Sequence, residues 1–168
     1  MAEGEKMSKS LGNFYTVHDL LQEFPGEAIR LTLLKTHYRQ PLDFTKDGIR
    51  EAKAELDGFY GALRGVPVTD GNDAPAALMD ALCDDLNTPL AISQLHSLAA
   101  VANKADSAAK PAAAAALKSA ASVLGLLQQD PEAWFKWQPP AKAGGLSDAE
   151  IDALIAERVA ARQAKDFA

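Results

Sequence analysis

The amino-acid sequence predicts an all-α protein, in which a helical bundle follows a short loop-rich segment. Apolar residues recur at helical spacing through most of the 168 residues, several of these runs begin at capping residues, and no segment alternates as a strand does. Hydrophobic residues make up 48% of the chain, and much of this is alanine, which favours helices but buries little area. The core is therefore expected to be thin and centred on leucine.

Three helices are predicted in the first part of the chain, over residues 16–24, 26–38 and 45–64. Thr16 and Thr45 are suitable N-caps, because a threonine oxygen can accept a hydrogen bond from a free N–H of the first turn. Pro25 ends the first helix and Gly65 ends the third. The second helix is expected to include Tyr38, which lies at helical spacing from preceding apolar residues.

Five further helices are predicted, over residues 74–86, 88–104, 107–128, 131–137 and 147–168. Thr88 followed by proline, and Asp130 followed by proline, indicate an N-cap and a first helical position. Ser147 and Glu150 have the spacing of a capping box. Residues 65–75 have the composition of a loop, and residues 138–145 that of a linker.

Composition excludes several classes of protein. The net charge of −6 argues against a free-standing nucleic-acid binder, and a single cysteine, Cys83, excludes an internal disulfide and any multi-cysteine metal site. No apolar run approaches a membrane span, and the first residues lack the apolar stretch of a signal peptide. A cytoplasmic protein without a membrane partner is expected. The sequence does not fix the oligomeric state, and a monomer is the default expectation.

A cationic loop lies near the start of the chain, in the stretch "EKMSKSLGNF". Lys6 and Lys9 alternate with Ser8 and Ser10, and Gly12 gives backbone freedom. Ammonium groups, hydroxyls and free amides are suited to binding phosphate oxygens. The composition alone is also that of an ordinary solvated surface loop.

As a string, residues 6–10 match the KMSKS signature of class I aminoacyl-tRNA synthetases. The chain resembles the cysteinyl-tRNA synthetase family most closely, through "KMSKSLGNFYTVHDLL", "IRLTLLKTHYRQPLDF", "DDLNTPLA" and "IDALIAERVAARQAKDFA", in that family's order. The resemblance touches nearly the whole chain. Residues 100–140 are its least diagnostic part.

The resemblance implies that Lys9 is catalytic and stabilises charge on the ATP phosphates as pyrophosphate leaves. Lys6, Met7, Ser8 and Ser10 are implied as the rest of the ATP-binding loop. The implied reaction activates cysteine with Mg-dependent ATP and transfers it to tRNA(Cys). The implied partners are therefore ATP, cysteine and tRNA(Cys).

The family resemblance also implies a domain order. Residues 1–44 would carry the KMSKS loop and stem-contact helices, 45–137 an anticodon-binding helical bundle of the class I synthetase type, 138–145 a linker, and 146–168 a truncated C-terminal helix. The family's nucleotide-binding core and zinc ligands match no stretch of this sequence, and no metal site is expected within it. We therefore expect part of a longer enzyme that is inactive alone.

Five basic residues are predicted to contact tRNA, namely Arg39, Arg64, Arg158, Arg162 and Lys165. Four of these assignments have an alternative. Arg39 also suits the basic last turn of a helix, where the helix dipole favours a cation. The last three residues form a stripe on one helix, which is equally typical of a solvated face.

Other conspicuous residues are expected to be structural. Residues 84–89 suggest an inter-helix turn, since they lack the alternating oxygen ligands of a calcium loop. Cys83 is expected to be partly buried in a helix. Trp134 suits a small core better than stacking on nucleic-acid bases. His18 and His37 are expected to be surface or hydrogen-bonded residues rather than ligands.

Two other functions stay open at the level of sequence. One is a related cysteine ligase that acts on an amino-sugar acceptor by the same adenylate chemistry. The other is a stand-alone helical interaction module, in which the KMSKS string would be an accident.

Overall fold

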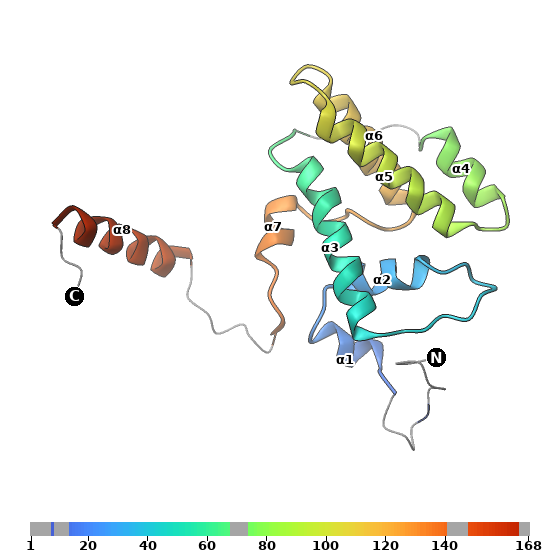
Figure 1. The fold of residues 1–168 in the computed structure, drawn as a ribbon, viewed down its shortest axis with the longest axis horizontal. Coiled ribbons are helices and arrows are strands. Elements are labelled where there is room, and N and C mark those ends of the chain that lie inside the picture. The colour runs from blue at the N-terminus through green and yellow to red at the C-terminus, as the bar shows by residue number, and fades with distance from the viewer. Residues whose placement is uncertain (1–7, 9–13, 68–73, 141–147, 165–168) are drawn as a thin grey trace. The chain divides into compact units, whose positions relative to one another are not determined.

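A computed structural model describes residues 8, 14–67, 74–140 and 148–164 (Figure 1). Contacts divide the chain into two units, Met1–Trp137 and Gln138–Ala168. The described residues form eight α-helices and no strand, which confirms the all-α prediction. The finer division at residues 44/45 and 145/146 stays a prediction.

Seven of these described helices lie in the first unit and one lies in the second. Their bounds are α1 Val17–Leu21, α2 Gly26–Leu34, α3 Lys46–Leu63, α4 Ala76–Cys83, α5 Thr88–Lys104, α6 Lys110–Val123, α7 Pro131–Lys136 and α8 Asp148–Ala164. The long helix α3 contacts α2, α5, α6 and α7, and α5 packs alongside both α4 and α6 (Figure 1). Helix α3 is therefore the element that joins the early helices to the later ones.

Capping side chains begin four of the helices. Thr16, Thr45 and Asp130 each accept a hydrogen bond from the N–H three residues ahead, which confirms them as N-caps. The predicted cap of α5 was wrong by one residue. Asn87 accepts from the Leu90 N–H, and Thr88 is the first helical residue. The Ser147 capping box lies outside the described residues.

Helix α2 ends earlier than predicted. It stops at Leu34, so Tyr38 lies beyond it and is 60% exposed, and the expected helical position of Tyr38 was wrong. The Tyr38 hydroxyl instead donates a hydrogen bond to Asp85, which lies between α4 and α5. The interpretation of Arg39 as a helical last-turn cation was wrong for the same reason.

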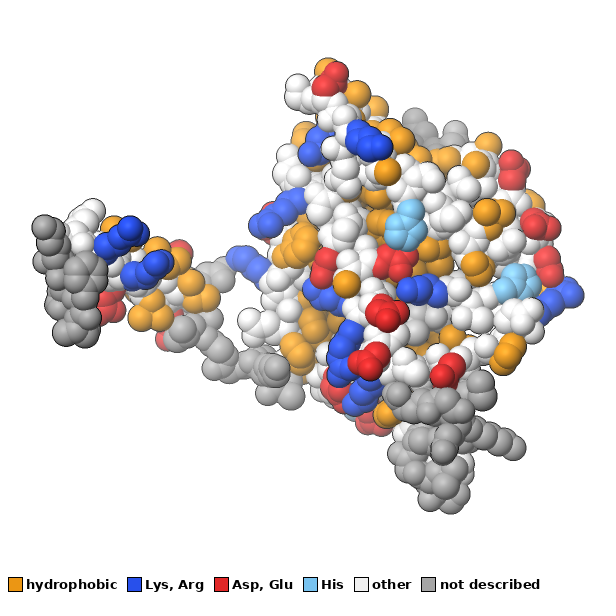
Figure 2. Space-filling view, viewed as in Figure 1, with side chains coloured by type: hydrophobic (Ala, Val, Ile, Leu, Met, Phe, Trp, Pro, Cys, Tyr) orange, Lys and Arg blue, Asp and Glu red, His pale blue; other side chains and the backbone are white. Residues whose placement is uncertain are grey.

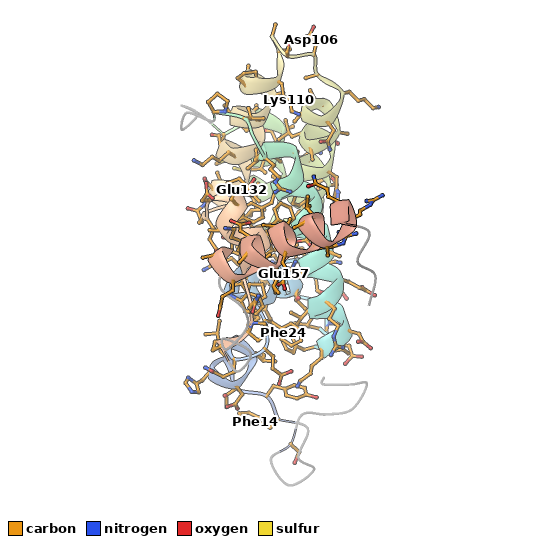
Figure 3. The ribbon with its side chains drawn as sticks, turned by 90° about the vertical axis from the view of Figure 1, so that its left-hand side faces the viewer. Phe14, Phe24, Asp106, Lys110, Glu132 and Glu157 are labelled. Atoms are coloured by element: carbon orange, nitrogen blue, oxygen red, sulfur yellow. The ribbon has the colours of Figure 1, made fainter. Side chains whose placement is uncertain are left out.

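The core of the first unit combines leucine with alanine and a few aromatic rings. Leu31, Leu56, Leu95 and Leu117 are fully buried and come from four different helices. Each buried leucine contributes about 1.5–3 kcal/mol relative to an exposed one. Alanines on α5 and α6 are buried between these helices, as expected for a thin core. Phe14 and Phe24 lie near the α1 end of the unit, and Asp106 and Lys110 near the opposite end (Figure 3).

Helix α8 and residues 138–140 form the described part of the second unit. The larger apolar side chains of α8 are exposed by 43–54% and recur at helical spacing, at Ile151, Leu154, Ile155 and Val159. None of the helices in the described ranges is long and apolar enough to cross a membrane.

Candidate functional site

The predicted phosphate-binding loop lies almost entirely outside the described residues. Lys6, Met7, Lys9 and Ser10 are outside them, and Ser8 is described and half-buried. The first described element after the loop is α1, which begins at the Thr16 cap. The roles implied for residues 6–10 therefore stay predictions.

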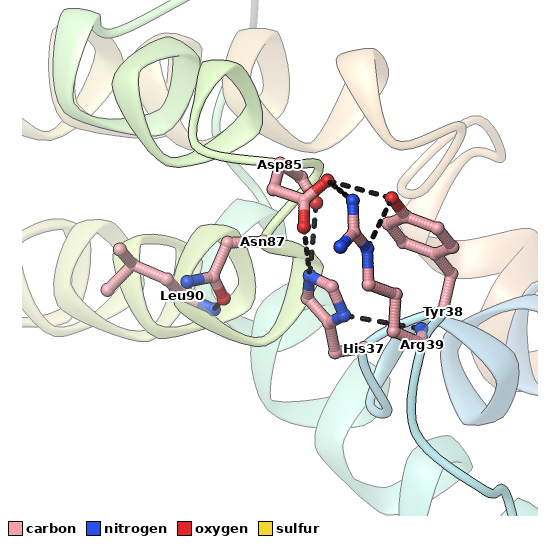
Figure 4. Close-up of polar contacts among 6 residues, drawn as sticks. All are labelled: His37, Tyr38, Arg39, Asp85, Asn87 and Leu90. Carbon is pink, nitrogen blue, oxygen red and sulfur yellow. Dashed lines mark hydrogen bonds and ion pairs between the residues drawn. The ribbon is translucent and has the colours of Figure 1, made fainter.

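A polar cluster joins the loop after α2 to the turn between α4 and α5 (Figure 4). Asp85 Oδ1 accepts from the Tyr38 hydroxyl at 2.7 Å and from Arg39 Nη2 at 3.0 Å. Arg39 Nε donates to the Tyr38 hydroxyl at 2.9 Å. His37 Nε2 lies 3.0 Å from the Asp85 carbonyl, and the Arg39 N–H donates to His37 Nδ1, so these bonds assign the ring proton to Nε2. Three consecutive residues thus hold one aspartate.

The backbone at this turn is unusual. Asp85 and Leu86 have φ values of 53° and 54°, a region that residues other than glycine rarely adopt. The pair closes the end of α4, where the Asn87 N–H donates to the Ala81 carbonyl at 3.2 Å. The expected inter-helix turn is confirmed at residues 84–87, whereas Thr88 and Pro89 already belong to α5. Cys83 ends α4 and is exposed, so its predicted partial burial was wrong.

Arg64 forms a second attachment, to α7. Its Nε and Nη2 donate to the two carboxylate oxygens of Glu132 at 2.6 and 2.9 Å, and its guanidinium lies 5.2 Å from the centre of the Phe135 ring. The hydrogen bond from Arg64 lowers the pKa of the Glu132 carboxyl, and the same bond raises the pKa of Arg64. Both groups lie on the surface, where such pairs add little to stability.

Several of the described basic residues of the first unit form ion pairs. Six described Lys and Arg side chains pair with carboxylates, at Lys35–Glu55, Arg39–Asp85, Lys46–Glu23, Arg50–Asp47, Lys53–Asp57 and Arg64–Glu132. Figure 2 shows blue and red side chains intermixed on the face that it draws, rather than a separate basic patch. A phosphate that approached Arg39 or Arg64 would therefore compete with a carboxylate already in place.

The remaining predicted RNA contacts belong to the second unit. Arg158 and Arg162 are exposed on α8, and Lys165 lies outside the described residues. The predicted set is therefore divided between two units, whose positions relative to each other are not determined.

A buried carboxylate connects α2, α3 and the turn between α6 and α7, and sequence reasoning did not predict it. Glu27 is 8% exposed, and its oxygens accept from the Leu127 N–H at 2.8 Å, the Gln128 N–H at 3.1 Å and the Tyr60 hydroxyl at 3.0 Å. The Tyr60 hydroxyl accepts in turn from the Gln129 N–H at 3.1 Å. The available signal was the position of Glu27 one turn before the buried Leu31, on the inward side of an amphipathic helix.

Aromatic packing surrounds this carboxylate. The Tyr60 ring stacks on Trp134 at a centroid distance of 4.5 Å, and Trp134 Nε1 donates to Asp57 at 2.7 Å. Trp134 is 1% exposed, which confirms its predicted place in a small core. Burial, together with the nearby charge of Glu27, raises the pKa of Tyr60, so its hydroxyl stays protonated and can donate.

His18 and His96 have different surroundings. His18 is exposed on α1, and His96 Nε2 lies 2.6 Å from Glu55. Among the described residues, no three His, Cys, Asp or Glu side chains lie together as a metal site would require.

An open hollow of about 410 Å³ lies on α1, α2 and the segment at Leu42 and Phe44, with mostly apolar side chains lining it.

Two family models match separate parts of the chain. The model for the class I (C) tRNA synthetase catalytic domain matches residues 1–54, and the DALR domain model matches residues 77–128. The first match contains the KMSKS string, α1 and α2, and the second contains α5 and α6. Glu27 and Asp85 therefore each connect one matched segment to the other.

Known proteins match the chain over nearly its whole length. Proteins named "Cysteine--tRNA ligase" from Rhodospirillum centenum, Paramagnetospirillum magneticum and Rhodospirillum rubrum are 59%, 57% and 50% identical to it, over 98%, 100% and 100% of the chain. The chain spans 36–37% of the length of these relatives. Over that span, the chain is similar to cysteine–tRNA ligases, and its first 54 residues match a class I synthetase catalytic-domain model.

Proposed function

We propose that this chain is part of a cysteine–tRNA ligase that activates cysteine with ATP and transfers it to tRNA(Cys). The observation that carries the proposal is the KMSKS string at residues 6–10, which lies inside the catalytic-domain match and is followed by the DALR match. Since the chain spans just over a third of its relatives' length, the adenine pocket and the cysteine site are assigned to the rest of the enzyme.

Lys9 is the proposed catalytic residue of this chain. Its ammonium group would stabilise the negative charge that builds on the ATP phosphates, which Mg²⁺ also neutralises, as pyrophosphate leaves. Lys6, Met7, Ser8 and Ser10 form the rest of the loop, in which the lysine and the hydroxyls supply further hydrogen-bond donors. A zinc ion for cysteine recognition is assigned to ligands elsewhere in the enzyme.

The helices of the first unit are the proposed tRNA-contacting part, with Arg39 and Arg64 as candidate phosphate ligands. Arg158, Arg162 and Lys165 on the last helix are the further candidates. Because Arg39 and Arg64 already pair with Asp85 and Glu132, we propose that they bind RNA by exchanging a carboxylate for a phosphate.

The test uses the complete ligase that contains this sequence. Lys9→Ala should lower cysteine-dependent ATP–pyrophosphate exchange about 100-fold or more, since one preorganised transition-state donor contributes roughly 2.7–4 kcal/mol. Lys104→Ala is the matched control, because Lys104 is an exposed lysine in the last turn of α5. Full exchange activity in the Lys9 variant would refute the role of the loop. Cysteine transfer to an amino sugar, but not to tRNA, would refute the proposed acceptor.

A further inference from the structure

The buried carboxylate of Glu27 bridges the two matched segments. Glu27 lies in α2, within the catalytic-domain match, and two of its hydrogen-bond donors, the Leu127 and Gln128 N–H groups, lie at the end of the DALR match. The third donor, Tyr60, belongs to α3 between the two matches. A single side chain thus fixes three separate parts of the fold.

The hydrogen-bond donors around Glu27 suit a carboxylate with two negatively charged oxygens. An anion in the interior is costly unless hydrogen-bond donors stabilise it, and here two consecutive N–H groups and a hydroxyl donate to the carboxylate oxygens. Leu127 adopts a left-handed φ of 57°, and Gly125 a φ of 66°. This backbone conformation directs the Leu127 and Gln128 N–H groups of the turn after α6 toward the Glu27 carboxylate. The carboxylate and the turn therefore stabilise each other's conformation.

Asp85 also connects the two matched segments, but here the carboxylate belongs to the second segment instead of the first. Its carboxylate comes from the DALR match and receives Tyr38 and Arg39 from the catalytic-domain match. The Asp85 bridge is exposed, with 46% of the aspartate side chain accessible, whereas the Glu27 bridge is buried. Two attachments at separate points fix an orientation as well as a distance, and the buried one is the stiffer of the two.

We propose that Glu27 is a positioning residue, which sets the orientation of α5 and α6 relative to the segment that carries the KMSKS loop. The inference rests on the proposed function. Activation of cysteine needs only the catalytic site. Charging a whole tRNA also requires the RNA-contacting helices to be held at a fixed distance and orientation from the adenylate. A displacement of about 1 Å between them can cost on the order of 100-fold in rate.

Glu27→Gln in the complete ligase separates these two requirements. Glutamine has the same shape, but its NH₂ group would face a backbone N–H, so one bond is lost and the turn must shift. Three rates are measured: cysteine-dependent pyrophosphate exchange, charging of whole tRNA(Cys), and charging of an RNA minihelix that contains only the acceptor stem. Exchange and minihelix charging should stay within about twofold of wild type, and kcat/KM for whole tRNA should fall about tenfold or more.

Glu23→Gln is the matched control, because Glu23 lies close in sequence but is exposed and pairs with Lys46. It should leave all three rates unchanged. If Glu27→Gln lowers the three rates together, its role is general stability and the proposal is overturned. It is equally overturned if whole-tRNA charging is unaffected.

Tyr60→Phe provides a second variant in case the glutamine variant does not fold. It removes one donor to Glu27 and the acceptor of the Gln129 N–H, and it keeps the ring stack on Trp134. The same split between whole tRNA and minihelix should appear at a smaller size. Absence of the split in a folded Tyr60 variant would overturn the proposal. A wild-type enzyme without pyrophosphate exchange would instead refute the proposed function.

Discussion

Replacing Tyr60 by phenylalanine in the 168-residue chain deletes one oxygen atom from the centre of the fold. That oxygen donates to the Glu27 carboxylate at 3.0 Å and accepts from the Gln129 N–H at 3.1 Å. Tyr60 is fully buried, so no solvent replaces the lost partner. A hydrogen bond to a charged group contributes about 1.5–3 kcal/mol, and a stranded donor adds a desolvation penalty, so the free energy of unfolding should fall by about 2–3 kcal/mol.

The control is the same deletion at the surface. Tyr38 also bonds a carboxylate, at 2.7 Å from Asp85, but it is 60% exposed, and water can replace the bond. Tyr38→Phe should therefore change the free energy of unfolding by less than about 0.5 kcal/mol. Urea unfolding followed by helical circular dichroism measures both, and the Tyr60 variant should also melt about 5–10 °C lower. Equal effects of the two variants would refute the assignment of Tyr60 and Glu27 as a buried pair.

The pH dependence provides a second check on Tyr60. Its pKa is raised in the folded chain, so its contribution to stability is fully present below the pKa of an unfolded tyrosine, about 10. The contribution is lost as pH rises above that value toward the folded-state pKa. The difference in stability between wild type and Tyr60→Phe should therefore narrow above about pH 10, and a constant difference would contradict this reasoning.

Two further predictions concern charge. Glu132 has a lowered pKa, so its stabilising contribution is present above the unfolded glutamate pKa of about 4.3 and is lost as pH falls toward the folded-state pKa. Because the pair with Arg64 lies on the surface, acid unfolding of Glu132→Gln should depend only slightly less steeply on pH than that of wild type, and a steeper dependence in the variant would contradict the lowered pKa. RNA binding by the chain should be weak, with a salt dependence that corresponds to only about two to four phosphates. Changing both Arg158 and Arg162 to Glu should weaken binding to cysteine tRNA and to an unrelated tRNA alike, and it should reduce the slope of log affinity against log salt. Fluorescence anisotropy across a salt series measures both effects. Tight binding of the chain to only one of the two tRNAs would contradict this prediction.

Local signals were the predictable part of the fold. Thr16, Thr45 and Asp130 were identified as caps because a cap and its N–H partner are three residues apart. Asn87 was missed in favour of Thr88 because both are good caps and adjacent. The exact KMSKS string made the family recognisable without any structural information.

Contacts between residues far apart in the chain could not be predicted from the sequence. Tyr38 was assigned to a helix because its spacing fits, and its actual partner, Asp85, lies 47 residues away. The pairing of Arg39 and Arg64 with carboxylates likewise depends on how the ends of α2 and α3 lie against the turn before α5 and against α7. The net charge of −6 does not show where the individual charges lie, and the described surface of the first unit mixes both signs.

The Glu27 contacts also bear on how the first unit folds and unfolds. They join positions separated by 33 and 100 residues, so they close loops whose entropic cost must be met by other packing first. A carboxylate also cannot leave water before the turn after α6 has formed to receive it. Contacts that form after the folding barrier mainly slow unfolding. We therefore expect the Glu27 contacts to slow the unfolding of the first unit more than they speed its folding.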